Sequence, residues 1–201
     1  YFSVCSETGQ PIMATMASTG ISTSQATKTL IESTSNILPY KALIVADKEH
    51  YTQETLHDLL AHEHYEILVP VINCPKIKNI MKELTYKPLW AGYSIAETPF
   101  CFHNNKQTFR LLVQRIGEID NPYTYTAFVT TSQRPADQLI AEDYDKRWTI
   151  EKFFQFEKMI GLSRASTHNL NVRYGKLGLA LMAQATTYEL RRSLHQECQN
   201  W

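Results

Sequence analysis

Four side chains with useful chemistry, Tyr144, Arg147, Glu151 and Lys158, recur at helical spacing in the stretch YDKRWTIEKFFQFEK. At about 100° per residue, an α-helix would place all four within one narrow stripe. A carboxylate among aromatic residues is costly unless it is paired or bound to a metal ion. Arg, Lys and Tyr side chains are suited to holding phosphate groups. The stretch therefore predicts a pocket-facing stripe that combines a metal ligand with phosphate contacts.

The same spacing has a simpler explanation, in which the charges form a solvated face of the helix. Glu151 lies four residues after Arg147 and seven before Lys158, so an ion pair with either one is the ordinary alternative. In the pocket-facing interpretation, we expect the apolar residues beside the stripe to anchor the helix in the core. They are Trp148 and Met159 on one side, and Ile150 and Phe154 on the other.

A second carboxylate, Asp47, ends the apolar run KALIVAD. A run of this length is typical of a fully buried central strand, and ligands of α/β sheets are usually met where strands end. The alternative is that Asp47 only caps a turn or the next helix. If Asp47 and Glu151 come together, they supply the oxygen ligands that Mg²⁺ prefers, and such ions can serve phosphodiester chemistry.

Other candidate sites have weaker signals. The rival metal-binding cluster, with His57, Asp58, His62 and His64, lacks the i, i+4 spacing of a helical zinc pair, so a solvated helix end explains it better. The four cysteines form no C-x-x-C pair, and glycine motifs for nucleotides or a nucleophilic serine do not occur. Trp90 could stack on an unpaired base, although packing is the commoner role.

Composition limits the function further. The chain has 201 residues, 43% of them hydrophobic and 20% charged, which indicates one globular domain or a domain with a large insertion. No apolar run approaches the roughly 20 residues that span a bilayer, so we expect no membrane segment. Net charge is zero overall, but residues 144–192 carry nine Lys or Arg against four Asp or Glu. That excess of five positive charges is compatible with one face meeting phosphates.

The elements that must position these residues alternate in type. A hairpin over residues 1–18, a helix near 22–38, a strand at 41–47, a helix that Thr52 caps and a strand at 66–72 predict a layered α/β domain. Turn residues and alternating segments predict a β-rich insertion over residues 74–135, with antiparallel strands. Helices are then expected from Pro135 onward and over residues 176–194. Residues 1–73 and 136–201 would form the core.

The spacing Tyr144-x2-Arg147-x3-Glu151-x6-Lys158 resembles the Y-R-E-K signature of bacterial DDE transposases in the insertion-sequence-four family. The stretch LIVADKEHYTQETL is similar to the segment that carries the second catalytic Asp in that family. The resemblance covers nearly the whole chain. It implies an α/β, ribonuclease-H-like fold with a β-rich insertion before the helix that bears the catalytic Glu.

By this resemblance, Asp47 and Glu151 are catalytic residues that bind Mg²⁺, for which Mn²⁺ can substitute. Tyr144, Arg147 and Lys158 are then DNA-binding residues that hold phosphates. The implied activity is DNA strand cleavage and strand transfer. The implied partners are the terminal inverted repeats of a transposon, target DNA and a second copy in a homodimer. A bacterial cytoplasmic location, at the nucleoid when bound to DNA, follows from the same resemblance.

The chain departs from the family pattern at its first catalytic Asp, which the family carries on the first strand of the fold. No Asp precedes Asp47. We therefore expect a catalytic-domain fragment of a longer transposase, incomplete at the N-terminus and inactive alone. The alternative is a truncated or domesticated remnant that acts only as a DNA-binding or structural module. A different ribonuclease-H-like nuclease is a third option, but it has no reason to keep the complete stripe.

Overall fold

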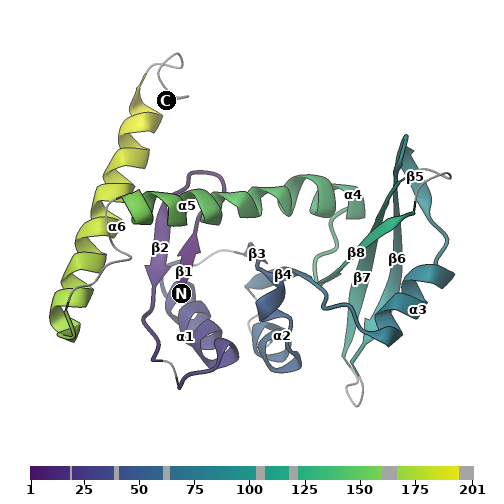
Figure 1. Ribbon diagram of the computed structural model, residues 1–201, viewed down its shortest axis with the longest axis horizontal. Helices are drawn as coiled ribbons and strands as arrows, with labels where there is room; N and C mark the ends of the chain where they lie inside the picture. Colours follow the sequence, from purple (N-terminus) through teal and green to yellow (C-terminus); the bar gives the residue numbers. More distant parts are fainter. Residues whose placement is uncertain are drawn as a thin grey trace. The chain divides into compact units, whose positions relative to one another are not determined.

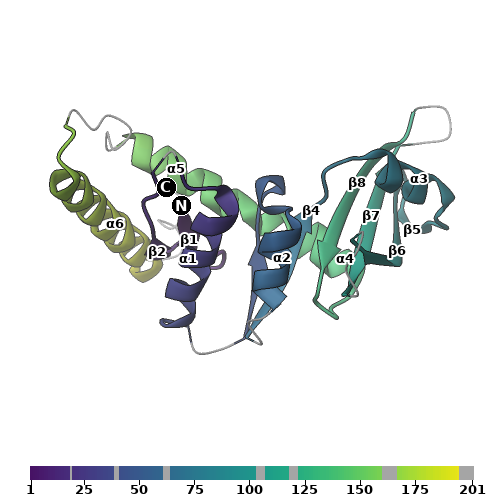
Figure 2. The same cartoon turned by 90° about the horizontal axis from the view of Figure 1, so that it is seen from below.

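A computed structural model of the chain describes residues 1–18, 20–38, 41–60, 64–102, 107–117, 122–159 and 167–194. The chain divides into two compact units. Unit 1 comprises Tyr1–Met16 and Lys146–Trp201, and unit 2 comprises Ala17–Asp145. The helices and strands of both are labelled in Figures 1 and 2.

Unit 2 is built on a six-stranded mixed sheet with the strand order β3-β4-β8-β7-β6-β5. The strands are β3 (Ala42–Val45), β4 (Tyr65–Pro70), β5 (Lys87–Trp90), β6 (Tyr93–Cys101), β7 (Thr108–Ile116) and β8 (Thr124–Thr130). β3 and β4 pair in parallel, whereas the other neighbours pair antiparallel. The sheet is therefore mixed, as an α/β domain with an antiparallel section requires.

β3 is the edge strand of this sheet, which corrects the prediction of a fully buried central strand. All four of its residues are only partly buried, because β4 is its single neighbour among the described strands. Its apolar run has another cause: Ala42 and Ile44 pack into a cluster on one face of the sheet, and Leu43 and Val45 into a cluster on the other. β4 is buried at five of its six positions, as predicted.

Helices cover both faces of the sheet. α1 (Thr23–Ser35), α2 (Gln53–Leu60) and α3 (Pro75–Glu83) contribute Ile31, Leu56 and Ile77 to the larger core cluster. The segment after β8 covers the other face with Leu139 and Ile140, which belong to the smaller cluster. Figure 2 shows α3 beside β5, β6 and β7.

Caps fix the starts of the first two helices, both of which were predicted. Ser22 and Gln25 form a capping box, in which each side chain accepts a hydrogen bond from the backbone N–H of the other at 3.3 Å. Thr52 caps α2, since its hydroxyl accepts a bond from the N–H of Thr55 at 3.1 Å.

Residues 74–135 contain the predicted antiparallel strands and one helix that was not predicted. That helix, α3, has Pro75 in its first turn, and Ile77 and Met81 are buried one turn apart. Because β8 pairs with β4, the antiparallel strands continue the sheet of β3 and β4. The proposed insertion boundaries at 74 and 135 stay a prediction.

The helical segment after β8 is less regular than predicted. Pro135 precedes a short helix, α4 (Ala136–Gln138), as expected. A π-helical turn over Leu139–Asp143 follows, and the N–H of Tyr144 closes it by donating to the carbonyl of Leu139 at 2.9 Å. A 3₁₀ turn, Asp145–Arg147, then precedes α5 (Trp148–Met159). Tyr144 therefore lies outside the regular α-helix, and the constant rotation assumed for the stripe does not apply to it.

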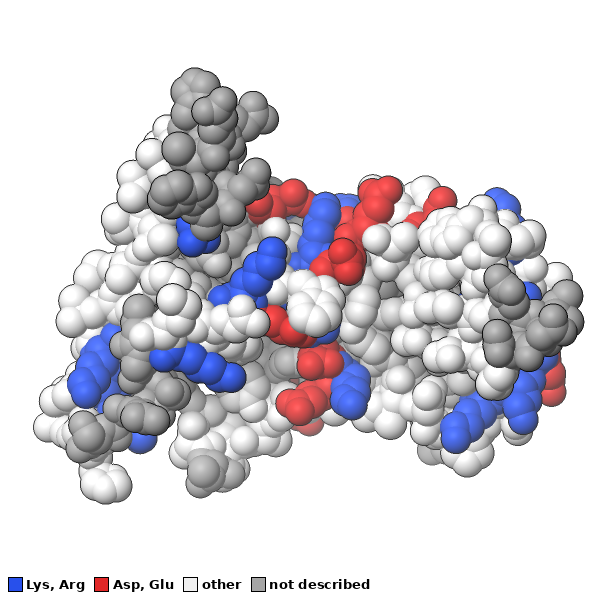
Figure 3. Space-filling model, turned by 45° about the horizontal axis from the view of Figure 1, so that its top comes forward, with Lys and Arg blue, Asp and Glu red and all other residues white. Residues whose placement is uncertain are grey.

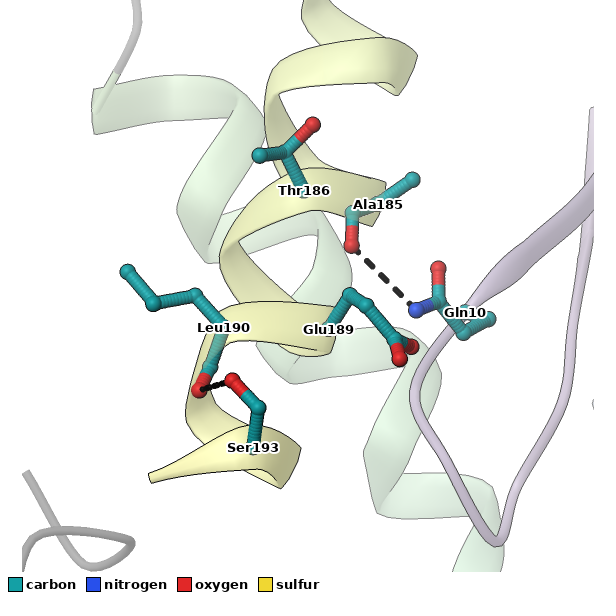
Figure 4. Close-up of a pocket in the computed structure, with 6 residues that line it drawn as sticks. All are labelled: Gln10, Ala185, Thr186, Glu189, Leu190 and Ser193. Atoms are coloured by element: carbon teal, nitrogen blue, oxygen red, sulfur yellow. Dashed lines mark hydrogen bonds between the residues drawn. The ribbon is translucent and has the colours of Figure 1, made fainter.

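Unit 1 combines the predicted hairpin, β1 (Phe2–Val4) and β2 (Pro11–Ala14), with α5 and α6 (Leu170–Ser193). α6 begins six residues earlier than predicted, because the side chain of Asn169 caps it. α6 runs beside β2 (Figure 1). In Figure 4 the amide of Gln10 donates to the carbonyl of Ala185 at 3.2 Å, which ties the hairpin to α6.

The hairpin depends on glycine at one position. Gly9 has φ of +71°, and a Cβ atom there would lie 2.7 Å from the ring of Tyr188 on α6. Both the backbone conformation and the close ring therefore exclude other residues. None of the helices in the described part of the chain combines the length and apolar character needed to cross a bilayer.

Candidate active site

Asp47 follows the end of β3 by two residues, and its side chain is exposed. Its Oδ1 accepts a hydrogen bond from the N–H of Lys48 at 2.6 Å and so caps the 3₁₀ turn Lys48–His50. The capping role offered as the alternative is therefore present. It does not exclude metal binding, because a carboxylate has about four lone-pair sites and this bond uses one.

The direction of the Asp47 side chain follows from the alternation of residues along the strand. Val45 lies on the smaller-cluster face of the sheet, and Ala46 on the larger-cluster face. Asp47 keeps an extended backbone, with φ of −79° and ψ of 164°, so its side chain returns to the face of Val45.

Tyr144 packs against the same smaller cluster. Its ring lies 4.7 Å from that of Phe128, centroid to centroid, in an edge-to-face arrangement. Tyr144 thus lies on the smaller-cluster face of the sheet, the face toward which the alternation along β3 directs Asp47. The π-helical turn directly before Tyr144 fixes where this side chain leaves the helical segment.

Two members of the predicted stripe, Glu151 and Lys158, lie on α5, and a third, Arg147, ends the 3₁₀ turn directly before it. Arg147 Nη2 lies 2.9 Å from Glu151 Oε1, so the predicted i, i+4 ion pair is present. The Arg147 side chain is 18% exposed and that of Glu151 36%. Lys158 is exposed and lies seven residues after Glu151 on the regular helix, which places it on the same line about 10 Å further along.

α5 is anchored by fewer aromatic residues than expected. Phe153 is fully buried, and its ring lies 5.0 Å from that of Phe2 in the hairpin. Trp148 and Met159 are 55% and 84% exposed, so the prediction that they anchor the helix in the core was wrong. Phe154 is 41% exposed but keeps an edge-to-face contact with the ring of Phe2, with centroids 5.6 Å apart. Only one side of α5 packs on the hairpin, and residues on its flanks stay at the surface.

The five predicted site residues fall into two groups. Asp47 and Tyr144 belong to unit 2, whereas Arg147, Glu151 and Lys158 belong to unit 1. In unit 1, Glu151 and Lys158 lie on α5 and Arg147 directly precedes it. In unit 2, Asp47 follows β3 and Tyr144 packs on the smaller cluster. The boundary between the units falls between Asp145 and Lys146, inside the predicted stripe.

The donor set is suited to a hard divalent cation. Asp47 and Glu151 offer carboxylate oxygens, the ligands that Mg²⁺ takes together with water. In the described residues, no group of three or more His, Cys, Asp or Glu could hold a metal by itself. Each of the two carboxylates is thus of the ligand type that Mg²⁺ takes.

The rival histidine cluster does not form a metal site in the part of α2 that can be seen. Asp58 is paired with Lys28 at 3.6 Å, and His57 lines a shallow surface hollow with Gln53 and Glu54. His62 lies outside the described residues. A solvated helix end, the preferred explanation, agrees with these contacts.

Trp90 has a packing partner. Its indole is 56% exposed and stacks on the ring of Tyr93, with centroids 4.3 Å apart and planes at 9°. This contact agrees with the packing role. Another hollow in the described surface lies between Gln10 of the hairpin and residues of α6, and Glu189 is its one carboxylate (Figure 4). Glu189 pairs with Arg192 at 2.8 Å.

A polar network that the sequence did not reveal holds the connection from β8 to α4. Ser132 donates to Glu66 at 2.7 Å, and Lys41 lies 3.1 Å from the same carboxylate. Burial raises the pKa of Glu66, but the bonds from Ser132 and Lys41 and the charges of Lys41 and Arg134 outweigh it, so the pKa lies below its ordinary value.

The same network reaches the residue before Tyr144. Arg134 Nη1 donates to Asp143 Oδ2 at 3.2 Å, and Asp143 is only 6% exposed. Arg110 on β7 donates to the carbonyl of Arg134 at 2.9 Å, which holds the connection from the sheet side. The only sequence signal for this arrangement is a carboxylate next to Tyr144, since its partners are distant in the chain.

Exposed cations gather on the helices of unit 1. They include Lys152, Lys158, Arg173, Lys176, Arg191 and Arg192. Figure 3 shows Lys and Arg side chains at the left of the view, where α5 and α6 lie. The predicted basic character of the C-terminal segment is therefore present at the surface.

Comparison with known families supplies an independent finding. The family model described as "Transposase DDE domain" matches residues 3–185. The comparison with curated proteins gave no match. The matched range includes both carboxylates and the three phosphate-binding candidates.

Proposed function

Because this chain belongs to the transposase DDE-domain family, we propose that it is the catalytic part of an enzyme that cuts and joins DNA at transposon ends. Family membership makes it a transposase domain that acts on DNA, in a family that generally uses divalent metal ions. The finer proposal is a bacterial enzyme of the insertion-sequence-four group, with a ribonuclease-H-like fold. Its partners would be terminal inverted repeats and target DNA.

The observation that carries this proposal is the arrangement of charges on α5 and on the turn directly before it. Glu151 is paired with Arg147, and Lys158 lies on the same line of the helix. When Glu151 turns to a metal ion, Arg147 becomes available for a phosphate that the same ion holds. A solvated ion pair alone would give no reason for Tyr144 and Lys158 to complete the pattern.

Each residue has a proposed role. Asp47 and Glu151 would hold Mg²⁺, or Mn²⁺ in its place, which activates the attacking oxygen and stabilises the leaving one. Arg147 would bind phosphate through two N–H donors, Lys158 as a point charge and Tyr144 through its hydroxyl. These contacts orient the DNA strand for attack by water and then by a 3′-hydroxyl. Catalysis would come from positioning and charge neutralisation, without a covalent enzyme intermediate.

We further propose that the third carboxylate of the triad lies outside this chain. No Asp precedes Asp47 in the sequence, and β3 pairs on one side only among the described strands. Residues 74–135 would be the insertion of the family, and two copies would bridge two DNA ends.

Replacement of Glu151 tests the function. In a longer protein that includes the first catalytic Asp, Glu151→Gln should abolish Mg²⁺-dependent cleavage of terminal-repeat DNA, by at least about 1,000-fold, because a metal ligand of the transition state is lost. DNA binding should be largely retained, as measured by gel shift. The control is the same change at Glu189 on α6, and the Glu189→Gln variant should cleave the DNA at the rate of the unsubstituted protein.

Two results would contradict the proposal. Undiminished cleavage by Glu151→Gln would remove the catalytic role of this residue. DNA binding without any cleavage by the unsubstituted longer protein would favour an inactive remnant that serves only as a DNA-binding or structural module.

A further inference from the structure

The inward face of α1 carries hydroxyl groups where apolar residues would be expected. Ser24 and Thr27 are 8% and 6% exposed, and they lie one turn apart on the face that also buries Ile31. A buried hydroxyl is costly unless it is hydrogen-bonded. Their partners therefore explain why these positions are polar.

Both hydroxyls bond to the turn that begins at Asp47. Thr27 Oγ1 lies 2.8 Å from Nδ1 of His50, and Ser24 Oγ lies 3.0 Å from Oγ1 of Thr52. Two hydrogen bonds thus join α1 to residues 50 and 52, which end and follow the turn.

The first of these bonds defines the tautomer of His50. Thr27 donates its single hydroxyl hydrogen to the carbonyl of Thr23 at 2.7 Å. Its oxygen can then only accept from the imidazole, so Nδ1 of His50 carries the hydrogen. A ring with hydrogen on Nδ1 is therefore the form that fits this contact.

His50 is connected to Asp47 through the backbone. The N–H of His50 donates to the carbonyl of Asp47 at 2.9 Å, which closes the 3₁₀ turn that the Asp47 carboxylate caps. A ring held by α1 therefore fixes the far end of a turn whose near end is the carboxylate. Only two residues, Lys48 and Glu49, lie between Asp47 and His50, so the backbone has little freedom to move one without the other.

We propose that His50, held by Thr27, is the positioning residue for the Asp47 carboxylate. His50 sets the direction in which Asp47 meets a divalent cation without touching that cation itself. This role rests on the proposed function, since it requires Asp47 to be a metal ligand. His50 is not one of the five predicted site residues, so this role extends the proposed site by one residue.

The test compares two threonines on the same helix. Thr27 and Thr29 both donate to the carbonyl four residues earlier, at 2.7 and 3.2 Å, but only Thr27 also bonds to His50. Thr27→Val should therefore weaken Mn²⁺ binding to the 201-residue chain by about tenfold, the lower end for outer-shell partners of metal sites. Thr29→Val should leave it unchanged. Binding is followed by water-proton relaxation.

Two further readouts separate positioning from general stability. Long-range ¹H–¹⁵N spectra of the histidine rings should show hydrogen on Nδ1 of His50 in the wild-type chain and in Thr27→Ser. Thr27→Val should lose this tautomer preference, and Thr27→Ser should restore Mn²⁺ binding. If Thr27→Val does not fold, His50→Asn, which keeps a donor near the Nδ1 position, should bind Mn²⁺ better than His50→Leu.

The result that overturns the positioning role is unchanged Mn²⁺ binding in Thr27→Val while Asp47→Asn abolishes it. Hydrogen on Nε2 of His50 in the wild-type chain would overturn it as well. If Asp47→Asn itself has no effect on Mn²⁺ binding, the proposed function fails instead, so the two failures are distinguishable.

Discussion

At the scale of residues, the ion pair between Arg147 and Glu151 is compatible with both explanations of the stripe. A distance of 2.9 Å between Nη2 and Oε1 is what a solvated helix face would show. It is also a resting arrangement for a metal ligand and a phosphate ligand before DNA arrives. The two explanations differ in what Arg147 does when DNA binds.

Replacement of Arg147 distinguishes them. In the longer protein, Arg147→Ala should weaken binding of a cleaved transposon end by about tenfold, and the slope of log K against log salt should fall by about one, because one phosphate contact is lost. Fluorescence anisotropy at several salt concentrations measures both quantities. The control is Lys152→Ala, which removes an exposed positive charge from α5 outside the stripe. Equal effects of the two changes would mean that Arg147 forms only a solvated ion pair and does not bind a phosphate.

At the scale of elements, the connection between β8 and α4 decides where Tyr144 lies. Glu66 on β4 accepts a hydrogen bond from Ser132 and forms an ion pair with Lys41. Arg134 donates a hydrogen bond to the buried Asp143, the residue before Tyr144. The sheet and the helical segment are therefore joined by charged hydrogen bonds as well as by the smaller apolar cluster.

The pH dependence of stability tests this connection. Glu66→Gln should lower the free energy of unfolding at pH 7 by about 1–3 kcal/mol, since it weakens hydrogen bonds to a charged, mostly buried carboxylate. The pKa of Glu66 is lowered in the folded protein, so its contribution is complete above the ordinary value of 4.5 and is lost as the pH falls through the folded value.

Urea unfolding between pH 7 and pH 4 makes this measurable. The difference between the wild-type chain and Glu66→Gln should shrink as the pH falls below about 4.5. Glu32→Gln, a change at an exposed position on α1, should show a difference near zero throughout. A difference for Glu66→Gln that stays constant or grows toward low pH would contradict the assignment.

Sequence patterns identified the elements whose burial repeats regularly. The strands at Tyr65–Pro70 and Thr108–Ile116 are predictable because covered faces impose an apolar run or an alternation. The edge position of β3 was not predictable, since it depends on which strands lie beside it. The π-helical turn was missed because one extra residue in a turn leaves the apolar periodicity nearly intact.

The site was predictable only where its residues are close in the chain. Arg147 and Glu151 are four residues apart in the sequence, so helical spacing predicted their contact. Thr27 and His50 are 23 residues apart, and nothing local marks either as a partner of the other. Such contacts depend on the packing of α1 against the Asp47 turn, which composition and periodicity do not encode.

At the scale of the whole molecule, the proposed site draws its two carboxylates from different units. Asp47 belongs to unit 2 and Glu151 to unit 1. The proposed mechanism requires both carboxylates to bind the same divalent cations. The proposal that this transposase-family domain is catalytic depends on that sharing.

The most direct test is a double-mutant cycle on Mn²⁺ binding by the 201-residue chain. Wild type, Asp47→Asn, Glu151→Gln and the double variant are compared by water-proton relaxation, with Glu189→Gln as the control. A shared site predicts that either single change removes the same bound Mn²⁺ and that the double change removes no more. Additive losses, or no loss in either single variant, would contradict a metal site formed by Asp47 and Glu151.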